Sequence, residues 1–131
     1  MKNITIFLAL AFTVMFSSPS FADWKEVGEN VKGHTFYVDF ERIRKQNGYV
    51  YWWELTDLLK PNKDGDLSYK RYTLGDCKLF RVKRLMMSFH NELMGRGTPV
   101  ATINKADKDW IYPPPNSSFE TILNEVCAYA K

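Results

Sequence analysis

Two histidines, His34 and His90, are the side chains best suited to acid–base chemistry in this 131-residue sequence. A hydrolytic site would pair one of them with a carboxylate, or would hold a metal through several donors. The sequence has no G-x-S-x-G, P-loop or H-E-x-x-H pattern. We therefore predict no catalytic residue, no metal site and no cofactor. A hydrolase that uses His34 or His90 is kept as an alternative.

The two cysteines, Cys77 and Cys127, are the other reactive side chains. In an oxidising compartment they allow a single pairing, whereas in the cytosol they would stay as free thiols. Because they are 50 residues apart, a bond between them would stabilise the domain by about 4 kcal/mol in the loop-entropy model. A Cys77–Cys127 disulfide is therefore expected if the chain is exported, and it would use up both thiols.

The first 22 residues indicate export. Lys2 precedes an uncharged, largely apolar run from Ile4 to Phe16, and small residues stand at Ser20 and Ala22. This layout is typical of a cleavable secretory signal. The apolar run is shorter than the roughly 20 residues that cross a bilayer. We predict a signal peptide over 1–22, which is cleaved after Ala22.

The exported domain is then 23–131, a length that suits a single domain. No cysteine follows the cleavage point directly, so we expect no lipid anchor and no membrane insertion after cleavage. The full chain has a net charge of +3, and losing Lys2 with no acidic residue leaves +2. That charge is too small to indicate a nucleic-acid partner.

Most of the exported domain has the pattern of β-strands. Aromatic and β-branched residues fill 34–40 and 49–58, and Asn47-Gly48 is the residue pair that a tight hairpin turn prefers. Further strands are predicted near 67, over 77–90 with a bend or bulge, and over 100–104. The sequence thus predicts an α+β fold, with an antiparallel sheet of five to six strands and one C-terminal helix packed on one face.

The helix is predicted from a capping box and a periodic apolar stripe. Ser117 and Glu120 form the S-x-x-E signature of a helix start. The stripe has helical spacing and consists of Phe119, Ile122, Leu123, Val126, Cys127 and Ala130. Because the stripe must face the sheet, it carries Cys127 toward Cys77, and the disulfide would fasten the helix to the sheet.

Two features favour binding. Tyr51 and Trp53 share one face of their strand with Tyr49 and Leu55, and a short helix covers only one face of a sheet. A basic cluster lies in 78–84 and consists of Lys78, Arg81, Lys83 and Arg84. Alternation places Arg81 and Lys83 on one face and the other two on the opposite face. Simple core packing and a solvated sheet edge are the structural alternatives.

The order of several short motifs resembles the surface-adhesin protein E family over nearly all of the exported domain. The residues that carry the resemblance are Trp24, the Tyr-x-Asp of "FYVDFERI" with Ile43, the "VYWWELTD" strand, Ser68, Lys70, Asp76-Cys77 and the closing "VC". The resemblance implies a flattened antiparallel sheet with a helix on one side, a disulfide, and a homodimer as one assembly. The adhesin that gives the family its name is a lipoprotein, whereas this sequence lacks a lipobox cysteine.

The resemblance also implies a function. We expect a non-catalytic binding protein, exported by a Gram-negative bacterium to the periplasm or the cell surface. Its partner would be a protein or a glycan, with host matrix and plasma proteins such as vitronectin, laminin and plasminogen implied by the family. The alternative is a periplasmic inhibitor or envelope assembly factor that binds another envelope protein.

Overall fold

The computed structural model describes residues 22–131, so the predicted signal peptide lies outside the described residues except for Ala22. The described part is an α+β domain with a seven-stranded sheet, as the sequence predicts in class. Its elements in chain order are β1 (Trp24–Glu29), β2 (Thr35–Asp39), η1 (Phe40–Arg42), β3 (Arg44–Gln46), β4 (Tyr49–Asp57), β5 (Ser68–Asp76), β6 (Arg81–His90), η2 (Leu93–Gly95), β7 (Ala101–Ile103) and α1 (Ser118–Tyr129). The strand number exceeds the predicted five to six because short strands such as β3 join the sheet.

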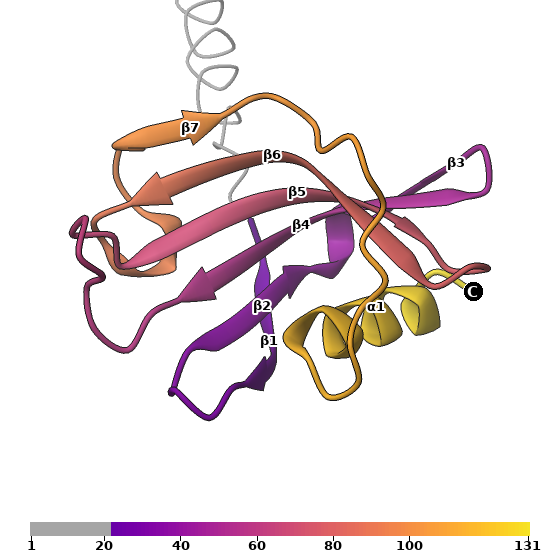
Figure 1. Cartoon of the computed structure of the whole chain (residues 1–131), viewed down its shortest axis with the longest axis horizontal. Helices are drawn as coiled ribbons and strands as arrows, with labels where there is room; N and C mark the ends of the chain where they lie inside the picture. The colour runs from indigo at the N-terminus through magenta and orange to yellow at the C-terminus, as the bar shows by residue number, and fades with distance from the viewer. Residues whose placement is uncertain (1–21) are drawn as a thin grey trace, which may run out of the picture.

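All strand pairs are antiparallel, and the order across the sheet is β1-β2-β4-β5-β6-β7 (Figure 1). Strand β3 pairs with the first half of β4, and β2 pairs with the second half. The predicted hairpin turn at Asn47-Gly48 is confirmed, since both residues have positive φ, 54° and 81°, and Gln46 pairs with Tyr49. The 3-10 turn η1 makes the step between β2 and β3.

Strand β6 carries the bulge that the long 77–90 segment suggests. Tyr72 of β5 pairs with Met86, whereas its neighbour Thr73 pairs with Arg84, so Leu85 is an extra residue without a partner. Side chains therefore alternate in one phase before Leu85 and in the other phase after it. The first residues of the segment, 77–80, form a turn before the strand starts.

The predicted helix is confirmed together with its cap. Ser117 Oγ accepts a hydrogen bond from the backbone N–H of Glu120 at 3.2 Å. Glu120 Oε1 in turn accepts from the backbone N–H of Asn116 at 3.2 Å. The first bond satisfies a donor that the first helical turn leaves free, and the second connects the residue before the cap to that turn.

The apolar stripe of α1 packs on the sheet as predicted. Its buried members Ile122, Leu123 and Val126 form the core with residues from β2, β4 and β6, namely Val38, Val50, Trp52 and Val82. Burial of each large apolar side chain stabilises the fold by roughly 1.5–3 kcal/mol. The Cys77–Cys127 disulfide is present, with 5.8 Å between the two Cα atoms, and fastens the last turns of α1 to the end of β5.

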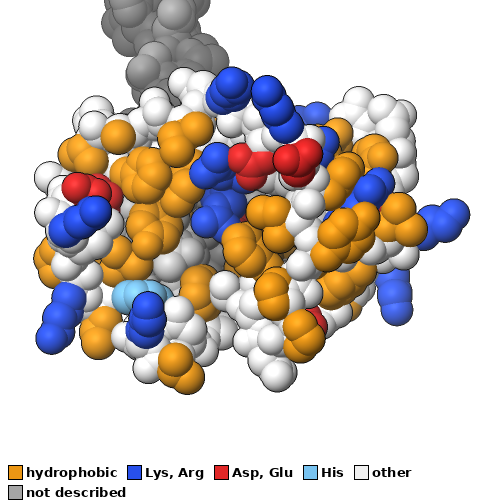
Figure 2. Space-filling model, in the orientation of Figure 1, with side chains coloured by type: hydrophobic (Ala, Val, Ile, Leu, Met, Phe, Trp, Pro, Cys, Tyr) orange, Lys and Arg blue, Asp and Glu red, His pale blue; other side chains and the backbone are white. Residues whose placement is uncertain are grey.

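The helix covers only part of its face of the sheet. It lies against β1 and β4, and the half toward β7 stays open (Figure 1). Hydrophobic side chains gather over that open half in the space-filling view (Figure 2). Tyr69 and Phe89 meet there edge to face at 5.8 Å. No helix within residues 22–131 combines the length and apolar character of a membrane span.

The opposite face is partly covered by the loop that contains η2. The backbone N–H of Met94 donates to Asp57 Oδ1 at 2.7 Å, and that of Gly95 donates to Ser68 Oγ at 2.9 Å. Beneath this loop Leu55 and His90 are buried. Among the described residues, no such loop covers the rest of this face, which is formed by the first half of β4, the second half of β5 and the first half of β6.

Candidate binding site

Aromatic and basic side chains converge on the face of the sheet that points away from α1. Strand pairing places Tyr51, Leu74 and Lys83 in one row across β4, β5 and β6. The next row begins with Trp53 and Tyr72. We call this surface the aromatic–basic strip, and its residues are Tyr49, Tyr51, Trp53, Tyr72, Arg81, Lys83 and Trp110.

The rings of the strip contact one another across the strands. The Trp53 and Tyr72 ring centroids are 4.9 Å apart, and those of Tyr51 and Tyr72 are 6.2 Å apart in a stacked arrangement. All three rings are only partly buried. Since paired aromatic rings stiffen one another, the strip offers a large apolar area at little cost in side-chain entropy.

Trp110 reaches the strip from a segment far away in sequence. Ile111 and Val82 exchange backbone hydrogen bonds of 2.8 and 2.9 Å, so 104–112 runs along the outer side of β6. This pairing places the centroid of the Trp110 ring 4.2 Å from the Arg81 guanidinium carbon and 4.9 Å from Lys83 Nζ. Both cations are therefore held against an indole face.

Arg81 has a structural partner as well. Its Nε donates to Asp76 Oδ2 at 3.0 Å, while Asp76 Oδ1 accepts from the backbone N–H groups of Lys78 and Leu79, each at 3.1 Å. Burial alone would raise the pKa of Asp76, but the Leu79 N–H and the Arg81 guanidinium outweigh burial and lower it. Arg81 thus holds the turn between β5 and β6, and Lys83 is the more available cation of the strip.

Four of the six binding residues predicted from sequence lie in the strip, namely Tyr51, Trp53, Arg81 and Lys83. Lys78 is exposed in the turn before β6. Arg84 lies on the α1 side of the sheet, where its Nη2 donates to Asp107 Oδ1 at 2.7 Å. The basic cluster of 78–84 is therefore divided between surfaces, in the way that strand alternation predicts for Arg84.

Sequence reasoning left two strip residues out. Tyr72 could have been found, because β5 pairs with β4 and its alternation follows from that pairing. Trp110 carries no local signal of its role, since it joins the strip through long-range pairing of 104–112 with β6.

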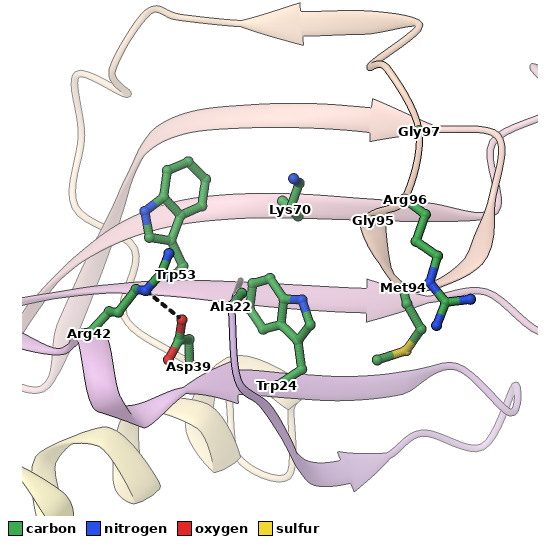
Figure 3. Close-up of a pocket in the computed structure, with 10 residues that line it drawn as sticks. All are labelled: Ala22, Trp24, Asp39, Arg42, Trp53, Lys70, Met94, Gly95, Arg96 and Gly97. Atoms are coloured by element: carbon green, nitrogen blue, oxygen red, sulfur yellow. Dashed lines mark ion pairs between the residues drawn. The ribbon is translucent and has the colours of Figure 1, made fainter. Parts of the chain in front are cut away.

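A pocket of about 810 Å³ adjoins the strip on the same face. It lies between β1, β2, the middle of β4 and β5, and the η2 loop (Figure 3). Its lining residues are Trp24, Asp39, Arg42, Trp53, Lys70, Met94, Gly95, Arg96 and Gly97, together with Ala22, the last residue of the predicted signal peptide. Trp53 belongs to both the pocket and the strip, so the two surfaces are continuous.

Both histidines are engaged in holding loops. His90 is fully buried, its Nε2 lies 2.9 Å from Ser88 Oγ, and its Nδ1 lies 3.2 Å from the Arg96 carbonyl. Burial lowers the pKa of His90, and the nearby Lys70 lowers it further. His34 Nδ1 accepts from the backbone N–H of Leu59 at 3.3 Å. The hydrogen bonds of both rings thus run to backbone groups and a serine.

Residues 24–128 match the family model described as Surface-adhesin protein E. The chain belongs to the surface-adhesin protein E family. The resemblance inferred from the order of motifs is therefore confirmed. No match is found among the curated proteins.

Solved structures of Haemophilus influenzae protein E have the same fold. Crystal form II of that protein superposes with a TM-score of 0.64 at 20% identity, covering 86% of this chain and 94% of that one. A second structure of protein E gives 0.61 at 19% identity, with 84% and 87% covered. Protein E from non-typeable Haemophilus influenzae gives 0.59 at 19% identity, with 85% and 79% covered. Membership in the surface-adhesin protein E family agrees with a non-enzymatic, exported protein.

Proposed function

We propose that this chain is an adhesive binding domain that holds a host extracellular-matrix or plasma protein on the aromatic–basic strip. The observation that carries the proposal is the strip itself. Partly exposed tyrosine and tryptophan rings lie beside Lys83 and Arg81 on a sheet face that α1 leaves open. Tyrosine, tryptophan and arginine are the residue types that dominate binding energy at protein interfaces.

The charge of the strip indicates the chemistry of the partner. Lys83 and Arg81 present positive charge around apolar rings, so the partner surface should combine acidic groups with apolar anchors. Binding should weaken as salt concentration rises, because part of the attraction is electrostatic. No covalent step is involved.

The experiment compares two charge reversals by surface plasmon resonance on immobilised vitronectin, laminin and plasminogen. Lys83→Glu places a negative charge in the strip and should weaken binding about tenfold or more and flatten its salt dependence. Lys45→Glu is the matched control, because Lys45 is an exposed strand lysine that pairs with Val50 and so lies on the α1 side. Arg81 is unsuitable for this test, because its replacement would also break the ion pair with Asp76.

A second variant tests the apolar part of the strip. Tyr51→Ala removes a ring that stacks on Tyr72 and should weaken binding by a similar factor at every salt concentration. Circular dichroism and thermal unfolding would establish that each variant is folded. If both strip variants bind every protein as tightly as the Lys45→Glu control, the strip is not the adhesive surface.

We further propose that the exported domain begins at Asp23 and reaches the cell surface without a lipid anchor. Intact-mass measurement of the exported protein would test the cleavage position and the anchor together. Protease treatment of whole cells would test location. Protection of the domain until the outer membrane is opened would favour the periplasmic inhibitor or assembly factor over the adhesin.

A further inference from the structure

The pocket beside the strip has the lining of a site for a small polar ligand with an acidic group. Its volume of about 810 Å³ is in the range of pockets that hold small molecules. Figure 3 shows the indoles of Trp24 and Trp53 with the side chains of Lys70 and Arg96 around the opening, and Asp39 between Arg42 and Trp24. Flat apolar faces, cations and a carboxylate thus surround one hollow.

The carboxylate of Asp39 is the most unusual of these groups. Its side chain is 1% exposed, and neither of its oxygens accepts a hydrogen bond from any described residue. The Arg42 Nε lies 3.4 Å from Asp39 Oδ2, which makes an ion pair but not a hydrogen bond. A buried carboxylate that no hydrogen bond satisfies is costly even when it has an ion pair, so this position favours a ligand that brings hydroxyl or amide donors.

The cations define the other end of the ligand. Lys70 comes from β5, and the exposed Arg96 comes from the η2 loop. The aliphatic stem of Lys70 packs against the backbone of Gly95. The contact is so close that a Cβ atom added to Gly95 would lie 3.0 Å from the Cγ and Cδ atoms of Lys70. A carboxylate or sulfate near the ammonium and guanidinium groups would form charge-assisted hydrogen bonds.

We propose that this pocket binds an acidic sugar residue of a glycan chain, with its ring against the tryptophans. The C–H groups on one face of a pyranose ring are slightly positive and pack on the negative face of an indole. The hydroxyl groups of the sugar donate to Asp39, and its carboxylate or sulfate accepts from Lys70 and Arg96. An acidic peptide would satisfy the cations, but it brings fewer donors to Asp39 and no flat saturated ring to the indoles.

The test measures oligosaccharide binding to the purified exported protein by isothermal titration calorimetry. A hyaluronan tetrasaccharide carries carboxylates, a heparin tetrasaccharide adds sulfates, and chitotetraose is a neutral control. We expect binding of at least one acidic probe, about tenfold or more tighter than chitotetraose. Comparison of the two acidic probes identifies which anion the cations prefer.

Variants place the binding in the pocket. Lys70→Met keeps the packed stem and removes the charge, and Arg96→Ala removes the second cation. Each should weaken acidic-probe binding about tenfold, because each removes a charge-assisted bond. Lys45→Met is the matched control and should bind as the unchanged protein does. Trp24→Leu should weaken the acidic and neutral probes alike.

Several outcomes would overturn the proposal. These are no binding of either acidic probe, equal binding of chitotetraose, or unchanged binding in Lys70→Met and Arg96→Ala. Loss of saccharide binding in Lys83→Glu with no effect of Lys70→Met would place the sugar on the strip instead. Because Lys83 does not line the pocket and Lys70 is not part of the strip, failure of the pocket proposal is distinguishable from failure of protein adhesion by the strip.

Discussion

The indole of Trp52 lies directly against the backbone of Gly75 on the neighbouring strand. A Cβ atom at position 75 would lie 2.5 Å from Trp52 Cζ3 and 3.1 Å from Leu123 Cδ1. Neither neighbour has room to move, because Trp52 Nε1 donates to the buried Glu54 at 2.8 Å and Leu123 is fully buried. The absence of a side chain at Gly75 therefore allows both the Trp52 indole and Leu123 of α1 to pack against the sheet.

Gly75→Ala should lower the free energy of unfolding by about 1–3 kcal/mol, because a methyl group overfills this part of the core. Urea unfolding followed by tryptophan fluorescence would measure the loss. Gly28→Ala is the matched control, since its new Cβ would make only ordinary contact, 3.7 Å from Thr121 Cγ2. Equal effects of the two substitutions would contradict the packing seen at Trp52.

Removal of the disulfide should destabilise the domain. The double variant Cys77→Ala with Cys127→Ala should lose about 2–5 kcal/mol, because the unfolded chain regains the freedom of a 50-residue loop. Urea unfolding with and without a reductant would measure this loss. The reductant should weaken the natural chain and leave the double variant unchanged, whereas an equal response of both would speak against the bond.

Stability should fall as pH is lowered from neutral toward 5, and His90 should account for part of the decline. Burial holds its pKa below the usual 6.5, so the unfolded chain takes up the proton first as pH drops through 6.5. A single group contributes a slope of at most about 1.4 kcal/mol per pH unit. Unfolding of the natural chain and of His90→Gln at pH 7.5, 6 and 5 would isolate this slope. Parallel curves would show that His90 titrates equally in both states.

A second loss of stability should occur in stronger acid and should depend on Asp76. Its pKa is lowered in the folded state, so its stabilising effect is present above about pH 3.8 and disappears as pH falls through the folded pKa. Asp76→Asn should be less stable at pH 7 but should show a flatter acid limb in urea unfolding between pH 4 and 2. An unchanged acid limb would mean that Asp76 is not the group responsible.

The sequence was sufficient for features that depend on local pattern or on simple counting. Alternation along β4 places Tyr51 and Trp53 on one face and Trp52 on the other, and the structure confirms it. With two cysteines in an exported chain, a single pairing is available, and it forms. The helix start at Ser117 follows from side-chain geometry within one turn.

Features that depend on where distant segments return could not be predicted. Trp110 enters the strip because Ile111 pairs with Val82, a contact with no trace in local composition. Met94 covers one end of the sheet by donating to Asp57, 37 residues earlier in the chain. The pocket is formed by this loop and by β1 together, so no single motif indicates it.

The unpaired Leu85 in β6 has a consequence for how this protein can change in evolution. Because it opposes no residue on β5, its replacement by another side chain disturbs no cross-strand pair. Deletion of Leu85 would have a larger effect, because every later side chain of β6 would turn to the other face of the sheet. Met87 would then exchange faces with Ser88 and His90. Substitutions at this half-buried position should therefore be tolerated when the new side chain is of similar size, while its removal should require a second, compensating insertion in the same strand.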